Sequence, residues 1–357
     1  MLKLSGRLIL IITAGVVFTA LVILLPSLLI SSYNAPSLIS KELQTTSIQI
    51  VPAVVHIETP EPLKAIYMTS CVAGTPSWRD GLKRLIETTE LNAVVIDIKD
   101  YTGEVAFNQS SRCFVKDLES FIRELHESGI YVIGRVSVFQ DPFYTQIFPE
   151  LAVKRKSDGE VWKDYKGLTF VDVGATPYWN YVVELSNRAY ELGFDELNYD
   201  YVRYPSDGNV NDVNYIWHTG TSTKSEMLEN FFSYLHENIK DIGVKTSVDL
   251  FGMTTTAGND MNIGQVLENA LPYFDYISPM VYPSHYPPTW NGFLNPAEYP
   301  YEVVKISMTS ALEREQLWFI ANDIATSTPS KMRPWLQDFH LGAFYGNIPK
   351  THFYLSN

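Results

Sequence analysis

From residue 64 onward, short runs rich in β-branched and aromatic residues alternate with longer segments whose apolar residues recur at helical spacing. This pattern predicts seven strands, at residues 64–69, 93–99, 131–139, 196–204, 245–251, 276–282 and 332–337. It predicts six helices between them, at residues 78–89, 115–128, 177–192, 224–242, 264–270 and 300–315. Repeated alternation of strand and helix is typical of parallel strands with helices on their outer side.

Glycines mark the expected ends of three of these helices. Gly129, Gly193 and Gly243 each follow a helical segment, at the position where a left-handed residue commonly caps a helix. No glycine-rich nucleotide loop follows the first strand, which weakens the dinucleotide-binding alternative. The sequence therefore predicts an α/β fold, a (β/α)8 TIM-type barrel, rather than an open doubly wound sheet.

The N-terminal part has a different pattern. Residues 8–30 form an uncharged run of 23 residues, long enough to cross a bilayer as a helix, and Lys3 and Arg7 precede it. The positive-inside rule then places the N-terminus in the cytoplasm and the rest of the chain outside. A cleaved signal peptide is the alternative, and it also exports the chain. Residues 31–62, with four prolines, predict an extracytoplasmic linker, so that residues 63–357 form the barrel domain.

Composition narrows the class of protein. The 357 residues are 46% hydrophobic and 13% aromatic, which supports a large core and excludes a disordered chain. The net charge of −13, without a basic patch, argues against nucleic acid as a partner. Seven scattered histidines without metal-ligand spacing predict no metal site, and no cofactor is expected. Cys71 and Cys113 follow the first two strands, on the same rim, so a disulfide is possible but not determined.

Charged residues interrupt strands that a parallel barrel should bury on both faces. Because side chains alternate between faces, Val94, Ile96 and Ile98 should face the helices and their neighbours should point inward. The inward set contains Asp97, Lys99, Arg135, Asn198, Asp200, Ser247, Asp249, Tyr282 and Gln337. Most lie late in their strands, at the end where such barrels carry their active sites. A purely stabilising network of ion pairs remains an alternative for any one of them.

Two of the inward carboxylates predict a reaction. Asp200 and Asp249 lie on neighbouring strands, about 4.8 Å apart, and glycoside hydrolysis needs such a pair. Like charges that close raise the pKa of one partner, which yields an acid and a base. Arg135 and Arg203 are expected to keep Asp200 ionised. The residues predicted to bind substrate are Asp97, Lys99, Arg135, Asn198, Arg203, Tyr282, His285, Gln337 and Asp338. Further aromatic residues near strand ends, Tyr201, Tyr204, Tyr286 and Trp290, either stack on sugars or pack the loops.

Four segments in order resemble a known family. They are residues 92–103 (NAVVIDIKDYTG), 194–205 (FDELNYDYVRYP), 276–285 (YISPMVYPSH) and 333–339 (RPWLQDF). Over residues 64–346 the chain resembles the bacterial putative glycosyl hydrolase domain, a TIM barrel distantly similar to α-amylase-type hydrolases. The resemblance implies that the carboxylate ending strand four, Asp200, is the nucleophile. The acid/base is less determined; Asp249 is the first choice, and Glu196 and Asp338 are held in reserve.

The chain departs from the family pattern at its end. Family members continue with a helix and a last strand, whereas residues 341–357 provide 17 residues where about 30 are needed. The eighth unit is therefore expected to be absent or replaced, which puts catalytic competence in question. The predicted function is a single-pass, membrane-anchored extracytoplasmic glycoside hydrolase-like protein that cleaves O-glycosidic bonds of a polysaccharide or oligosaccharide. The rivals are a non-catalytic carbohydrate-binding module and a structural cell-envelope barrel.

Overall fold

A computed structural model describes residues 54–325 and 328–339. Within these two ranges, no helix is both long and apolar enough to cross a membrane. The predicted anchor at residues 8–30, most of the predicted linker, and the segment 341–357 on which the missing eighth unit depends all lie outside the described residues.

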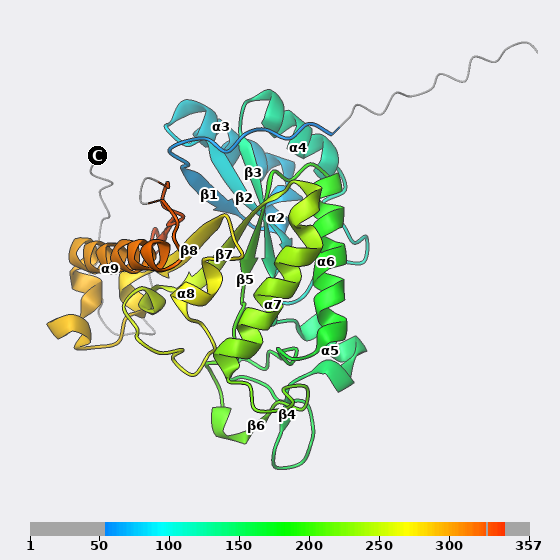
Figure 1. The fold of residues 1–357 in the computed structure, drawn as a ribbon. Coiled ribbons are helices and arrows are strands. Elements are labelled where there is room, and N and C mark those ends of the chain that lie inside the picture. The colour runs from blue at the N-terminus through cyan, green and yellow to red at the C-terminus, as the bar shows by residue number, and fades with distance from the viewer. Residues whose placement is uncertain (1–53, 326–327, 340–357) are drawn as a thin grey trace, which may run out of the picture. The chain divides into compact units, whose positions relative to one another are not determined.

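The centre of the domain is a curled parallel sheet of seven strands (Figure 1). In spatial order they are β1 (Ala65–Met68), β2 (Ala93–Lys99), β3 (Tyr131–Ser137), β5 (Glu196–Asp200), β7 (Lys245–Phe251), β8 (Tyr276–Val281) and β9 (Trp335–Leu336). Every neighbouring pair is parallel, as the alternation of strand and helix predicts. All seven predicted strands are present, and the sheet is TIM-barrel-like. Because the strands are parallel, their carboxyl ends meet at one edge.

Five strands are shorter than predicted, and two of them, β5 and β9, lose four residues each. β5 ends at Asp200 because Tyr201 has a φ of 52°, in the left-handed region where a strand cannot continue. β9 keeps two residues, since Pro334 offers no N–H to a neighbouring strand. At the beginning of that predicted strand, Met332 forms a single isolated β-bridge with Ile277.

Helices connect the strands on the outer side of the sheet (Figure 1). They are α3 (Pro76–Thr88), α4 (Leu118–Glu127), α6 (Thr176–Glu191), α7 (Lys224–Ile239), α8 (Leu267–Ala270) and α9 (Pro300–Ala321). α7 begins with a capping box, in which the side chains of Thr223 and Glu226 satisfy each other's backbone N–H groups. Gly129, Gly193 and Gly243 have φ values of 71°, 109° and 84°, so the predicted left-handed caps are confirmed.

Several short elements were not predicted. They are α2 (Ser70–Ala73), α5 (Pro142–Ile147), the strands β4 (Lys154–Arg155) and β6 (Val213–Asn214), and the 3-10 helices η1 (Pro149–Leu151), η2 (Val210–Asp212), η3 (Lys240–Ile242), η4 (Gly252–Thr255), η5 (Pro283–His285), η6 (Trp290–Gly292) and η7 (Pro296–Glu298). β4 and β6 pair antiparallel and join the loops that follow β3 and β5. Segments of two to six residues carry too little periodicity to be read from the sequence.

The two faces of the sheet bury different residues. Val94, Ile96 and Ile98 belong to the main core with Phe121 and Leu125 of α4, so their predicted outward direction is confirmed. The contact between β2 and β3 is close on this face: a Cβ atom on Gly134 would lie 2.2 Å from Cδ1 of Ile98. No other residue type fits there without displacing its neighbours.

The inner face of β2 and β3 is apolar where these strands begin and charged where they end. Ala93, Val95, Tyr131 and Ile133 form a second cluster, against which Ile57, Leu63, Ala65 and Trp335 pack. Ile57, from the predicted linker, donates its backbone N–H to Oδ1 of Asp195 at 2.8 Å, and Thr59 bonds the Tyr131 hydroxyl at 3.0 Å. The last part of the predicted linker therefore packs against the domain, because it covers this apolar cluster.

Candidate active site

Arg135 of β3 is the centre of a cluster of three inward carboxylates. Its Nη1 donates to Oδ1 of Asp97 at 2.7 Å and its Nη2 to Oδ2 of Asp200. Its Nε lies 4.0 Å from Oδ2 of Asp249. One guanidinium thus contacts acidic side chains from β2, β5 and β7. Because both contact this group, the nearest oxygens of Asp200 and Asp249 lie within about 9 Å, inside the range that glycoside hydrolases use.

Strand register explains why these side chains meet. Asp97 pairs with Arg135, Arg135 with Asn198, and Asn198 with Ser247, so four strands contribute one inward layer. Asp200 and Asp249 each follow this layer by two residues and therefore point to the same side, one step nearer the carboxyl ends. The register thus places Asp200 and Asp249 in one layer on neighbouring strands.

The cluster is almost completely removed from solvent. Asp97 is 2% exposed, Asp200 6% and Asp249 1%. Burial by itself lowers the pKa of Arg135, but the charges of Asp200 and Asp97 outweigh it and raise that pKa well above its usual value. Arg135 is therefore a permanent cation, and it is the group that makes burial of these carboxylates tolerable.

Asp200 and Asp249 differ in their surroundings. Asp200 accepts a hydrogen bond from the Arg135 guanidinium and one from the backbone N–H of Tyr201, the latter at 2.5 Å. Burial, followed by the charge of Asp200, raises the pKa of Asp249 to about 8. At neutral pH Asp249 is therefore held as a carboxylic acid, which is the form that a general acid requires.

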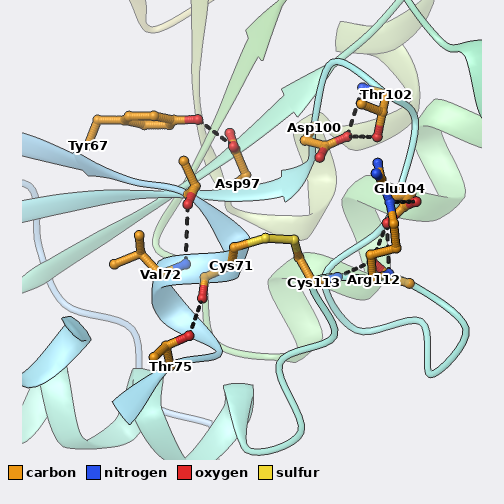
Figure 2. Close-up of a disulfide and its surroundings, with 12 residues drawn as sticks. Tyr67, Cys71, Val72, Thr75, Asp97, Asp100, Thr102, Glu104, Arg112 and Cys113 are labelled. Atoms are coloured by element: carbon orange, nitrogen blue, oxygen red, sulfur yellow. Dashed lines mark hydrogen bonds and ion pairs between the residues drawn. A yellow bond between two sulfur atoms is a disulfide. The ribbon is translucent and has the colours of Figure 1, made fainter. Parts of the chain in front are cut away.

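Asp97 occupies the far side of Arg135. Its Oδ2 accepts a hydrogen bond from the Tyr67 hydroxyl at 2.5 Å, and Figure 2 shows this pair. Burial raises the pKa of Asp97, and Arg135 and Tyr67 oppose that shift. Burial also raises the pKa of Tyr67, so this hydroxyl stays protonated and donates. With Tyr67 and Arg135 both bonded to it, Asp97 acts as a support for the guanidinium.

A half-open aromatic rim lies beside the cluster. The rings of Tyr282, His285 and Phe339 meet edge to face, with centroids 5.2 to 5.8 Å apart. Gln337 holds the intervening loop by accepting both the N–H and the hydroxyl of Ser284. Burial lowers the pKa of His285, which keeps its ring neutral. The predicted residues Tyr282, His285 and Gln337 are thus together, and Phe339 joins them.

Lys99 does not lie in the cluster, contrary to the prediction from strand alternation. The register between β2 and β3 shifts between Asp97 and Lys99, which turns the lysine away. Its ammonium pairs with Asp141 at 2.8 Å and donates to the Tyr178 hydroxyl of α6 at 2.9 Å. Lys99 and Asp141 are both 0% exposed, so this pair supports the fold and has no open path to a substrate.

Arg203 likewise does not orient Asp200, as had been predicted. Its Nη1 donates to the backbone oxygen of Tyr204 at 3.0 Å and to Ser206 at 3.1 Å. Its guanidinium lies over the rings of Phe251 and Tyr201, at 4.9 and 5.3 Å from their centroids. The left-handed turn at Tyr201 breaks the alternation, so counting inward positions fails beyond Asp200.

The two reserve carboxylates lie elsewhere. Glu196 is the first residue of β5, at the opposite end of the strand from Asp200, where it pairs with Arg333 and accepts from Ser247. Asp338 is exposed and contributes no side-chain hydrogen bond within the described part of the chain. Glu196 therefore does not take the place of Asp249 as the partner of Asp200, and the reserve role of Asp338 stays a prediction.

Three residues of the site were not predicted. Tyr67 occupies an inward position of the first strand, Trp335 lies in the RPWLQDF segment, and Phe339 ends that segment. The prediction followed charged residues within strands, so it overlooked aromatic side chains that complete the cluster. The sequence carried part of this information. Tyr67 and Trp335 are large aromatic residues in short buried strands, where aliphatic residues are usual.

A disulfide joins Cys71 of α2 to Cys113 in the loop after β2, with Cα atoms 4.4 Å apart (Figure 2). The sequence left this pairing open. The bond connects the segments that follow β1 and β2, the strands that carry Tyr67 and Asp97. Among the described residues, no group of three or more acidic, histidine or cysteine side chains is arranged to hold a metal ion.

Comparison with known proteins identifies the family of this domain. The family model described as "Putative glycosyl hydrolase domain" matches residues 65–354. The chain belongs to this family. The resemblance seen in four sequence segments is thereby confirmed, and the inward carboxylates are those of a glycosyl hydrolase-like domain. No functionally curated protein matches the chain.

Solved structures include similar folds. A hypothetical protein from Ruminiclostridium thermocellum ATCC 27405 is 31% identical, with a TM-score of 0.47, covering 52% of this chain and 96% of that one. The PgaB (BpsB) glycoside hydrolase domain from Bordetella bronchiseptica is 10% identical, with a TM-score of 0.52, covering 78% and 94%. An α-galactosidase from Thermus thermophilus is 12% identical, with a TM-score of 0.45, covering 72% and 49%. At 10% identity the Bordetella domain shows a shared fold and nothing about substrate.

Proposed function

We propose that this chain hydrolyses O-glycosidic bonds of a polysaccharide or oligosaccharide, with Asp249 as proton donor and Asp200 as nucleophile or base. The observation that carries the proposal is the shared guanidinium: Asp200 and Asp249 both contact Arg135, and the pKa of Asp249 is raised to about 8. The glycosyl hydrolase-like family supports the reaction class.

In the proposed reaction, Asp249 gives its proton to the glycosidic oxygen while the bond to the anomeric carbon breaks and its electron pair goes to that oxygen. Asp200 either attacks the anomeric carbon or takes a proton from the water that does so. Arg135 donates to Asp200 and orients its carboxyl group. The aromatic rim formed by Tyr282, His285 and Phe339 is proposed to contact the sugar, because flat apolar ring faces stack on such surfaces.

The test is hydrolysis of a glycan panel by the full chain, read as newly formed reducing ends. The panel should include α- and β-linked neutral, amino and acidic sugars, since the cluster does not select among them. Release of reducing ends by the wild-type protein supports the proposal, provided that the control variant Asp241→Asn releases them equally well. Asp241 is a suitable control because it is exposed and lies at the end of α7, away from the cluster. Retention of a glycan without cleavage would instead indicate a binding module.

The pH dependence of hydrolysis is expected to follow Asp249. Its pKa of about 8 means that the proton donor is present below pH 8 and is lost as the pH rises through that value. The rate constant kcat should therefore fall about tenfold per pH unit on the alkaline side of pH 8. A kcat that stays constant from pH 7 to pH 10, with the protein folded, would contradict the assignment of Asp249 as acid.

A non-catalytic carbohydrate-binding or structural barrel is the second candidate. It is favoured by the burial of the cluster, because Asp97, Asp200 and Asp249 are each at most 6% exposed. A purely stabilising network would show the same ion pairs. In that case no glycan would be cleaved, whereas neutralising Asp200 would change only the stability of the fold.

We also propose that the domain is displayed outside the cytoplasm and is anchored by residues 8–30. The uncharged run with Lys3 and Arg7 before it supports this, as does the Cys71–Cys113 disulfide, since such bonds persist in oxidising compartments. Protease added to intact cells should degrade the domain. Full protection until the cells are lysed would overturn this placement.

A further inference from the structure

One oxygen of Asp249 is held by two N–H donors from different strands. The amide Nδ2 of Asn198 on β5 and the indole Nε1 of Trp335 on β9 both donate to Oδ1, each at 2.8 Å. Both donors are themselves held in place. Asn198 also donates to the Ser247 hydroxyl at 3.0 Å, and the Trp335 ring packs edge to face against Tyr67, with centroids 6.5 Å apart.

The other oxygen, Oδ2, has a different environment. Its nearest cation is Nε of Arg135, at 4.0 Å, and that guanidinium also binds Asp200. Two N–H groups occupy the lone-pair directions of Oδ1, so a proton on Oδ1 would displace one of them. A proton on Oδ2 displaces nothing. The neutral carboxyl therefore carries its hydrogen on the oxygen that faces Arg135.

We propose that Asn198 and Trp335 are positioning residues that clamp Oδ1 of Asp249 and so keep its acidic proton on Oδ2, on the side of Asp200. This inference rests on the proposed function and deepens it: Asn198, predicted above to bind substrate, acts through the acid instead. It also gives the two-residue strand β9 a role, since it brings the Trp335 indole to the cluster.

The clamp has a consequence for the reaction. When Oδ2 loses its proton to the glycosidic oxygen, negative charge spreads over both oxygens of Asp249. Hydrogen bonds to a charged acceptor are about twice as strong as those to a neutral one, so both donors stabilise the product carboxylate more than the acid. The clamp therefore lowers the barrier to proton transfer without contacting the substrate.

The test is the pKa of Asp249 in the full chain, measured by carbon NMR of labelled aspartate carboxyls and assigned by the signal that Asp249→Asn removes. Trp335→Phe keeps a ring and deletes the N–H. We expect the pKa of Asp249 to rise by about one unit, with kcat falling about tenfold and KM unchanged within about twofold. Trp318→Phe on α9, a half-buried tryptophan outside the cluster, is the matched control and should change neither value.

Asn198→Ala removes the second donor and guards against a folding defect in the first variant. An upward shift of the pKa in either folded variant supports the clamp. An unchanged or lowered pKa in both would overturn it, whatever the activity. If the pKa rises but no glycan is ever cleaved, the clamp stands and the proposed hydrolysis fails, so the two outcomes are distinguishable.

Discussion

Replacing Asp200 with asparagine is expected to reduce kcat for glycan hydrolysis by about a thousandfold or more. The amide can neither attack the anomeric carbon nor accept a proton from water, so the step that follows or accompanies bond cleavage loses its reactive group. The measurement is the release of reducing ends from the best substrate of the panel, with KM determined separately.

The fold should survive this change. Arg135 keeps Asp97 as a partner at 2.7 Å, and asparagine has nearly the shape of aspartate. Asp241→Asn carries the same chemical change at an exposed position and should retain wild-type activity. A folded Asp200→Asn protein with more than about a tenth of wild-type kcat would remove Asp200 from the mechanism.

Replacing Arg135 with methionine is expected to lower the free energy of unfolding at pH 7 by about 3–5 kcal/mol. Methionine fills similar space but leaves Asp97 and Asp200 buried without their cation. The measurement is the midpoint of urea unfolding. Arg188→Met is the matched control, because the Arg188–Glu191 pair is more than half exposed on both sides and such pairs contribute about 0–1 kcal/mol.

Two further observations separate lost charge from lost packing. Adding Asp97→Asn and Asp200→Asn to Arg135→Met should restore most of the stability, since only Asp249 then remains and burial keeps it protonated at pH 7. The single variant should also gain stability as the pH falls. Without Arg135, burial raises the pKa of both carboxyls in the folded state, so the folded protein takes up protons that the unfolded chain does not. If Arg135→Met lost the same unfolding free energy at pH 5 and pH 8, lost packing rather than lost charge would be the main cause of the destabilisation.

The inward direction of Asp97, Arg135, Asn198 and Asp249 could be predicted from the sequence. Side chains in a strand alternate strictly, so a polar residue among outward apolar ones can only point inward. Three strand pairings in register then bring them together without further information. The same period failed at Lys99 and Arg203, because a register shift and a left-handed residue each break the alternation locally.

By itself, the sequence determined the parallel strand–helix order and the family and nominated the pair Asp200 and Asp249, because these depend on local periodicity and on short segments. Tertiary structure alone decided which other groups hold that pair. The sequence predicts Arg135 beside Asp200, whereas it does not predict Trp335, which reaches Asp249 from 86 residues further along the chain. Contacts between residues so far apart depend on how the sheet curls and on side-chain length, and neither is encoded in the pattern of any one segment.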